Sequence, residues 1–166
     1  MRRTAVCALL TVASAVVLAG CGGEKQAPTQ GSVGVTTVTT ESREGGEAAI
    51  AVCRQVITSA GVMVRDYNAF VTALNKTQSY AELGTEARYA RDTLDTGADE
   101  IRKTLSPAVP ADIEQKVQSF LTATEQLSEQ IAKRRKLALN KATEEWSDER
   151  TELIDACGEF VPTGVT

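Results

Sequence analysis

Apolar residues recur at alternating steps of four and three along much of the chain after residue 45. This spacing places them on one face of an α-helix. In the first such segment the apolar face consists of Ala49, Cys53, Val56, Ala60, Met63, Tyr67, Phe70 and Leu74. We therefore predict a helix within residues 46–76. No segment shows the strict alternation of apolar and polar residues that indicates a strand.

Three further segments carry a helical pattern. The second contains Tyr80, Leu83, Ala87, Ala90, Leu94, Ala98, Ile101 and Leu105, and ends at Ser106-Pro107. The third opens at Pro110, since proline suits the first turn of a helix, and its apolar face contains Ile113, Val117, Phe120, Thr124, Leu127 and Ile131. The last contains Trp146, Leu153, Cys157 and Phe160, and stops at Gly158–Pro162. Together these patterns predict an all-α domain.

The N-terminus has the order of a secretory signal peptide, with two arginines followed by an apolar stretch from Ala5 to Ala19. That stretch ends in Leu18-Ala19-Gly20-Cys21, which resembles the lipobox of bacterial lipoproteins. The resemblance implies cleavage after residue 20 and a diacylglyceryl group on the Cys21 thiol. It also implies a chain anchored to the extracytoplasmic face of the cell membrane. The alternative is an uncleaved membrane helix, but the strongly apolar part is shorter than the ~20 residues that span a bilayer.

Residues 21–45 follow the signal peptide and are rich in Gly, Thr and Ser, with only isolated valines as larger apolar residues. Such a composition cannot bury enough surface to fold. We therefore expect a flexible tether at 21–45, a helical domain at 46–161 and a disordered tail at 162–166. The remaining length suffices for one domain.

Two cysteines remain after the signal peptide and the lipidated residue are set aside, namely Cys53 and Cys157. Exported domains meet an oxidising environment, where two such thiols most often form a disulfide. Metal ligation is the weaker alternative, because the chain has no histidine and two lone cysteines make a poor metal site. We expect a Cys53–Cys157 disulfide, with no metal and no cofactor.

The disulfide also bears on the topology. An unbroken helix from residue 110 to 159 would be about 75 Å long, and its end would lie far from Cys53 near the start of the first helix. A disulfide needs Cα atoms within about 7 Å, so the chain must turn back once more. We predict that turn at Asn140–Thr143. The result is an antiparallel up-down-up-down four-helix bundle whose last helix is the shortest.

Charge narrows the choice of partners. Without Arg2 and Arg3 the chain carries 16 basic and 22 acidic side chains, and an acidic domain argues against nucleic acid as a partner. The scarcity of aromatics and the abundance of Ala and Thr resemble exported actinobacterial proteins.

The basic run at residues 133–136 is interpreted as one side of a hairpin. It would face the acidic start of the next helix, at Glu144, Glu145, Asp148 and Glu149. A docking patch for an anionic partner is the alternative.

Candidate chemistry is sparse. The charged pairs of the second segment fall at i,i+4 spacing, which is typical of a solvated helix face, and no nucleophile motif is present. We name no catalytic residue and do not expect an enzyme. The candidate ligand or partner contacts are Asp66, at the edge of the apolar face of the first segment, its neighbour Tyr67, and Trp146, the only tryptophan. A boundary salt bridge for Asp66 and core packing for Trp146 are the simpler interpretations.

Two hypotheses for function follow. The first is a membrane-anchored, non-enzymatic accessory or protein-interaction module of the cell envelope. The second is a carrier or sensor of a hydrophobic ligand held between the helices near Met63, Tyr67, Phe70 and Phe120. The alanines on the apolar faces leave room for either close packing or a cavity, so the sequence does not choose between them.

Overall fold

The computed structural model describes the backbone of residues 35–161 and the side chains of residues 43–161. Within that range it contains four α-helices and one short 3₁₀-helix. They are α1 (Val35–Thr77), η1 (Tyr80–Glu82), α2 (Glu86–Thr104), α3 (Ala111–Lys133) and α4 (Lys136–Cys157). The predicted signal peptide, Cys21 and the tail at 162–166 lie outside the described residues.

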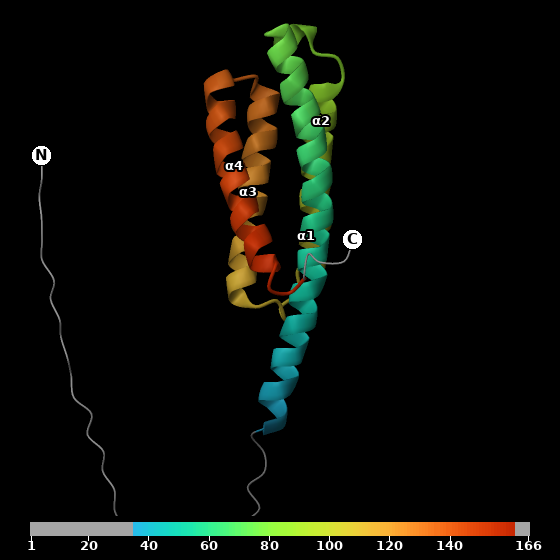
Figure 1. Ribbon diagram of the computed structural model, residues 1–166, viewed down its shortest axis with the longest axis vertical. Coiled ribbons are helices and arrows are strands. Elements are labelled where there is room, and N and C mark those ends of the chain that lie inside the picture. Colours follow the sequence, from blue (N-terminus) through green and yellow to red (C-terminus); the bar gives the residue numbers. More distant parts are fainter. Residues whose placement is uncertain (1–34, 162–166) are drawn as a thin grey trace, which may run out of the picture. The chain divides into compact units, whose positions relative to one another are not determined.

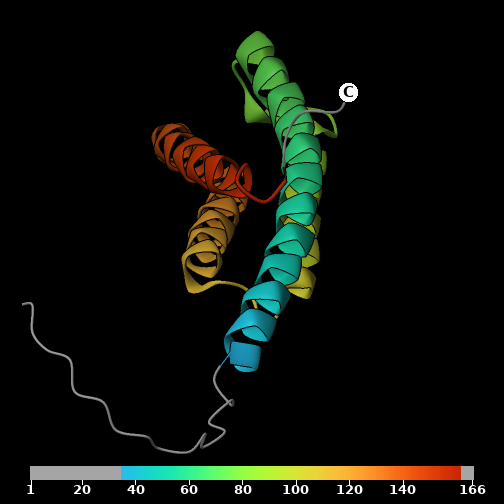
Figure 2. The same ribbon diagram turned by 60° about the horizontal axis from the view of Figure 1, so that its bottom comes forward.

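The four helices form two antiparallel hairpins, α1 with α2 and α3 with α4 (Figure 1). The hairpins are joined through α2 against α3 and α1 against α4, so that each helix packs on two neighbours. Figure 2 shows the same pairing from a second direction. The chain is therefore an all-α, up-down-up-down four-helix bundle, which confirms the predicted fold class.

The core is built from the predicted apolar faces. Met63, Phe70, Leu94, Phe120 and Leu153 have no exposed surface, and burial of a side chain of this size contributes ~1.5–3 kcal/mol. The predicted disulfide is also present. Cys53 on α1 is bonded to Cys157 at the end of α4, with their Cα atoms 5.3 Å apart.

Helix α1 is long and apolar enough over Arg43–Thr77 to cross a membrane, judged by length and composition alone. In the bundle its apolar face is covered, because α2 and α4 pack against it and Val56, Met63 and Phe70 are fully buried. We therefore interpret α1 as a core helix.

Helix α1 begins at Val35, which differs from the predicted tether at residues 21–45. The prediction rested on a composition rich in Gly, Thr and Ser, which buries too little apolar surface to fold by itself. Two contacts involve residues 43 and 45 of this segment. Arg43 and Glu47 form an ion pair at i,i+4 spacing (3.1 Å). Gly45 lies against the α2–α3 connection, where a Cβ at its position would be only 3.4 Å from the carbonyl oxygen of Ala108.

The turn between α3 and α4 lies at Arg134–Arg135, so its prediction at Asn140–Thr143 was wrong. Arg134 adopts the left-handed conformation (φ 57°) and its N–H donates to the carbonyl oxygen of Ile131. The buried face of α4 starts with Leu139 and Ala142, and the helix must begin before them. As a result α4 has 22 residues and α2, with 19, is the shortest α-helix of the described part.

The second helix also starts later than its pattern suggested. Gln78 (φ 56°) follows the end of α1, and Tyr80 lies in η1, whose first turn is capped by the hydroxyl of Ser79 accepting from the N–H of Ala81. Tyr80 and Leu83 still pack against the core. They were therefore correctly predicted as apolar contacts and wrongly placed on α2.

Candidate functional site

Two of the three predicted contact residues, Tyr67 and Trp146, meet in the centre of the bundle. Their ring centroids are 5.6 Å apart, and both residues are nearly fully buried, at 5% and 2% exposure. The Tyr67 hydroxyl is hydrogen-bonded to the hydroxyl of Thr143, which donates in turn to the carbonyl oxygen of Leu139. Burial raises the pKa of Tyr67, so the phenol is protonated at neutral pH and acts as the donor.

The polar end of Trp146 is satisfied in the same way. Its Nε1–H donates to the hydroxyl of Thr124 (3.1 Å), and that hydroxyl donates to the carbonyl oxygen of Phe120 (2.8 Å). A buried tryptophan whose N–H has a partner stabilises a packed core. Trp146 therefore has the core-packing role that was the simpler interpretation of its position.

Asp66 connects α1 to α2. Its carboxylate accepts from Arg65 (2.7 Å) and from the hydroxyl of Thr93 on α2 (2.7 Å). The hydrogen bond from Arg65, followed by that from Thr93, lowers the pKa of Asp66. This is the boundary salt bridge, with the Thr93 contact added.

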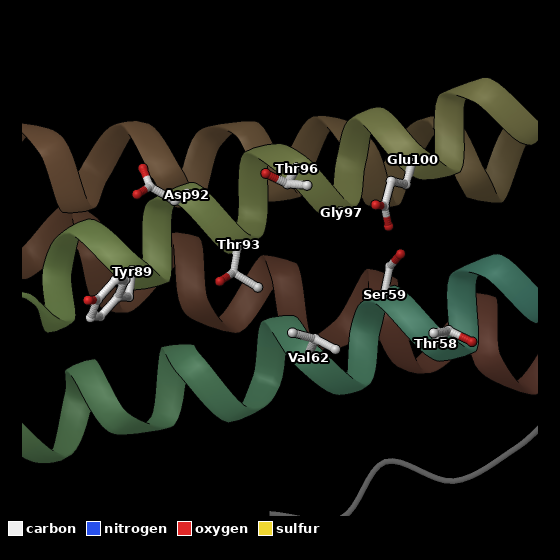
Figure 3. A pocket seen from close by; sticks show the side chains of 9 residues that line it. All are labelled: Thr58, Ser59, Val62, Tyr89, Asp92, Thr93, Thr96, Gly97 and Glu100. Carbon is white, nitrogen blue, oxygen red and sulfur yellow. The ribbon is translucent and has the colours of Figure 1, made fainter.

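A surface groove of about 320 Å³ runs between α1 and α2 (Figure 3). We call it the α1–α2 groove and define it by the residues that line it: Thr58, Ser59, Val62, Tyr89, Asp92, Thr93, Thr96, Gly97 and Glu100. Ser59 and Glu100 face each other across it in Figure 3. Two of its apolar side chains are exposed to solvent, Val62 at 39% and Tyr89 at 52%.

The groove is narrow because Gly97 brings the two helices together. A Cβ at this position would lie 2.4 Å from the terminal methyl group of Met63. Sequence reasoning did not find this site. The available signal was the polar face of α2, where Thr93, Thr96 and Gly97 place small residues beside the out-of-pattern Tyr89.

No group of three or more His, Cys, Asp or Glu side chains in the described part of the chain could hold a metal ion. The comparisons with known proteins place the fold rather than a chemistry. A family model described as the Rv2240c four-helix bundle domain matches residues 37–158, which is more than half of the chain. The chain belongs to this family.

The matched range covers nearly all of α1 and the whole of α2, α3 and α4. It starts inside the segment predicted as a tether, in agreement with the early start of α1. No curated protein matches the chain, and no solved structure matches it.

The basic run at residues 133–136 lies at the turn between α3 and α4. The predicted acidic start of the next helix was wrong, because α4 begins at Lys136 and has no acidic residue in its first turn. The ion pairs nearest the basic run are within single helices. Lys133 pairs with Glu129 on α3, and Lys141 pairs with Glu145 on α4. Lys136 reaches across to the end of α1 and donates to the carbonyl oxygen of Gln78 (3.1 Å). Lys136 therefore links the turn between α3 and α4 to the end of α1.

Proposed function

We propose that the protein is a membrane-anchored bacterial lipoprotein and serves the cell envelope as a non-enzymatic accessory or protein-interaction module. The lipobox ending in Cys21 supports the anchor. The buried Cys53–Cys157 disulfide supports export, because disulfides persist in oxidising compartments.

The α1–α2 groove is the observation that carries the interaction role. Tyrosine is enriched in the energetically important centres of protein interfaces, and Tyr89 stands exposed along the same groove as Val62. The charged side chains lining the groove, Asp92 and Glu100, are both acidic. Asp92 pairs with Arg88, whereas Glu100 accepts only from the amide of Gln55 in the described part. The partner that fits is an envelope protein presenting an apolar side chain next to a lysine or arginine.

The packing of the core favours this proposal over a carrier of hydrophobic ligands. The residues expected around an internal ligand, Met63, Tyr67, Phe70 and Phe120, are at most 5% exposed. Tyr67 contacts both Phe70 and Trp146, and Phe120 stacks on Trp146. Their side chains thus fill the space that a ligand would occupy.

Site-specific photo-crosslinking in intact cells tests the interaction role. A photo-reactive amino acid replaces Val62 or Tyr89 in the groove, and the control replaces Leu137. Leu137 is also apolar and exposed, at 89%, but lies at the start of α4. We expect a discrete heavier product from the groove positions only. Monomer alone, or the same products from all three positions, would contradict the proposal.

Fractionation tests the anchor separately. The substitution Cys21→Ala removes the thiol that would carry the lipid and should release the chain from the membrane fraction. Continued tight membrane association of this variant would indicate a spanning segment instead.

A further inference from the structure

A second pocket, of about 290 Å³, lies at the end of the bundle that holds the two hairpin turns. We call it the tip pocket. Its walls come from η1, the start of α2 and the end of α3, and its polar side chains are Tyr80, Arg88, Arg91 and Arg134. Leu83, Ala87 and Ile131 supply an apolar wall. Three guanidinium groups around one cavity are unusual in a chain whose net charge is negative.

Two of these three arginines have no carboxylate partner in the described part of the chain. Arg88 pairs with Asp92 at 3.4 Å, whereas neither Arg91 nor Arg134 takes part in a salt bridge there. The Nε of Arg91 is buried and has no hydrogen-bond partner. Leaving a buried donor unsatisfied is unfavourable, and more so for a charged group, so Arg91 calls for a ligand that the bundle itself does not provide.

Tyr80 supplies a second unsatisfied donor, which is uncharged. Its hydroxyl is buried without a hydrogen-bond partner. Burial, followed by the charge of Tyr67, raises the pKa of Tyr80, while Arg134 acts in the opposite direction. The phenol is therefore protonated at neutral pH and offers an unused donor to the pocket.

Glu86, at the start of α2, is an acidic residue that also has an unpartnered atom. Its Oε2 is buried without a hydrogen-bond partner and lies 3.1 Å from the point where a Cβ would stand on Gly84, a pocket residue. Even with Glu86 and Asp92 counted, the positive charges of the three arginines exceed the negative charges. The pocket thus favours an anion.

The backbone conformation of Arg134 also bears on the pocket. This residue ends α3 in the left-handed conformation, which normally selects glycine or asparagine because a Cβ is strained there. The chain instead has an arginine whose side chain lines the pocket. The residue that ends α3 thus also supplies one of the guanidinium groups of the pocket.

We propose that the tip pocket binds a phosphate group carried on a small organic moiety. The phosphate oxygens would accept from Arg91, Arg134 and the Tyr80 hydroxyl, since guanidinium groups match phosphate in geometry and charge. The organic part would lie on Leu83, Ala87 and Ile131. Either a phospholipid headgroup or a soluble phosphoester carries this chemistry.

Calorimetric titration tests the site. The full chain with Cys21→Ala, purified from an oxidising compartment, is titrated with inorganic phosphate and with glycerol 3-phosphate at constant ionic strength. We expect saturable binding of both, with glycerol 3-phosphate binding more tightly. The substitutions Arg91→Gln and Arg134→Gln should each weaken binding about tenfold or more, as expected for a charge-assisted hydrogen bond.

Two arginines outside the pocket serve as matched controls. Arg135 is the neighbour of Arg134 at the same turn, and Arg54 is an exposed residue of α1 near the disulfide. Arg135→Gln and Arg54→Gln remove the same charge and should change affinity less than twofold. No binding of phosphate, equal binding of acetate, or equal weakening by the control variants would overturn the proposal.

A further variant keeps the test decisive if the arginine variants fold poorly. Tyr80→Phe retains the ring and its contact with Phe70, and removes only the unused donor. It should weaken phosphate binding while leaving the unfolding transition unchanged or higher; unchanged binding would remove Tyr80 from the site. Flotation with phosphatidylglycerol vesicles then separates the two sources. If the protein binds the vesicles and Arg134→Gln abolishes that binding, the ligand is a lipid headgroup. If the protein does not bind the vesicles, the ligand is a soluble phosphoester.

Discussion

The middle of the bundle and its tip differ in whether their buried polar groups have hydrogen-bond partners. In the middle, the hydroxyl of Tyr67 and the indole N–H of Trp146 each have a partner, and each partner is bonded in turn to a backbone carbonyl. At the tip, the hydroxyl of Tyr80 and the Nε of Arg91 are buried without one. Satisfied polar groups stabilise a packed core, whereas a buried unsatisfied group calls for a further partner such as water, an ion or a ligand.

The difference extends to the backbone. Two non-glycine residues of the described part have a positive φ, Gln78 and Arg134, and both lie at the tip. The opposite end of the bundle is closed by the Cys53–Cys157 disulfide. Stability is therefore concentrated in the middle and at the disulfide, while the strained positions are concentrated at the tip.

The largest effect should come from removing the disulfide. The paired substitutions Cys53→Ala and Cys157→Ala open a loop with a sequence separation of 104, for which the chain-entropy model gives about 4–5 kcal/mol. We expect the free energy of unfolding in urea to fall by about 3–5 kcal/mol, since native removals fall in this range. Reduction of the native protein should give the same value. A loss below about 1 kcal/mol would mean that the helices alone fix this end of the bundle.

The next largest effect separates two glycines within helices. Gly97→Ala places a methyl group against Met63 where α1 and α2 pack closely, and such overpacking costs ~1–3 kcal/mol. Gly61→Ala on the exposed side of α1 meets nothing within 4 Å and should stabilise by up to ~1 kcal/mol through helix propensity. The two variants should therefore shift the urea midpoint in opposite directions. Shifts of the same sign would show that Met63 moves aside freely.

A pair of tyrosine variants compares the middle with the tip directly. Tyr67→Phe removes the donor to Thr143 and should cost ~1 kcal/mol. Tyr80→Phe removes a hydroxyl that has no partner and should be neutral or stabilising by up to ~1 kcal/mol in the absence of ligand. Both variants keep the ring, and thermal unfolding measures the difference. Equal losses would mean that the Tyr80 hydroxyl also has a partner in solution.

The sequence was sufficient for the parts of the fold that depend on periodicity. The apolar faces of the helices followed from the spacing of Ala49 to Leu74 and its counterparts, because core burial decides that spacing. The disulfide followed from the export signal and the two cysteines left after it, and the number of helices followed from the disulfide. The boundaries depended on single contacts instead. Gly45 was predicted to lie in the tether but lies on α1 against Ala108 of the α2–α3 connection, and no local pattern reveals a contact between residues so far apart in the sequence.

The candidate sites were less accessible to sequence reasoning for a related reason. Asp66, Tyr67 and Trp146 stood out because each is a polar or unusual residue near an apolar stripe, yet such residues are commonly satisfied by the bundle itself. The tip pocket combines Tyr80, Arg91 and Arg134 from η1, α2 and the end of α3. Its prediction required the true α3–α4 turn, which the change from basic to acidic residues placed six residues too late.

The smallest effect concerns pH and the polar contacts of Asp66, which link α1 to α2. The Arg65 and Thr93 contacts lower the folded-state pKa of Asp66 below its ordinary value of 3.8. A lowered folded-state pKa means that the stabilisation is fully present above the unfolded-state pKa and is lost as the pH falls through the folded-state pKa. We expect Asp66→Asn to lower the unfolding free energy by about 0.5 kcal/mol at pH 7, in the range of exposed ion pairs. The difference from the native protein should shrink below pH 4.

The control Asp95→Asn removes an exposed carboxylate of α2 that has no ion pair in the described part and should leave the profile unchanged. If the Asp66→Asn difference persisted undiminished at pH 2, its source would be the shape of the side chain rather than its charge.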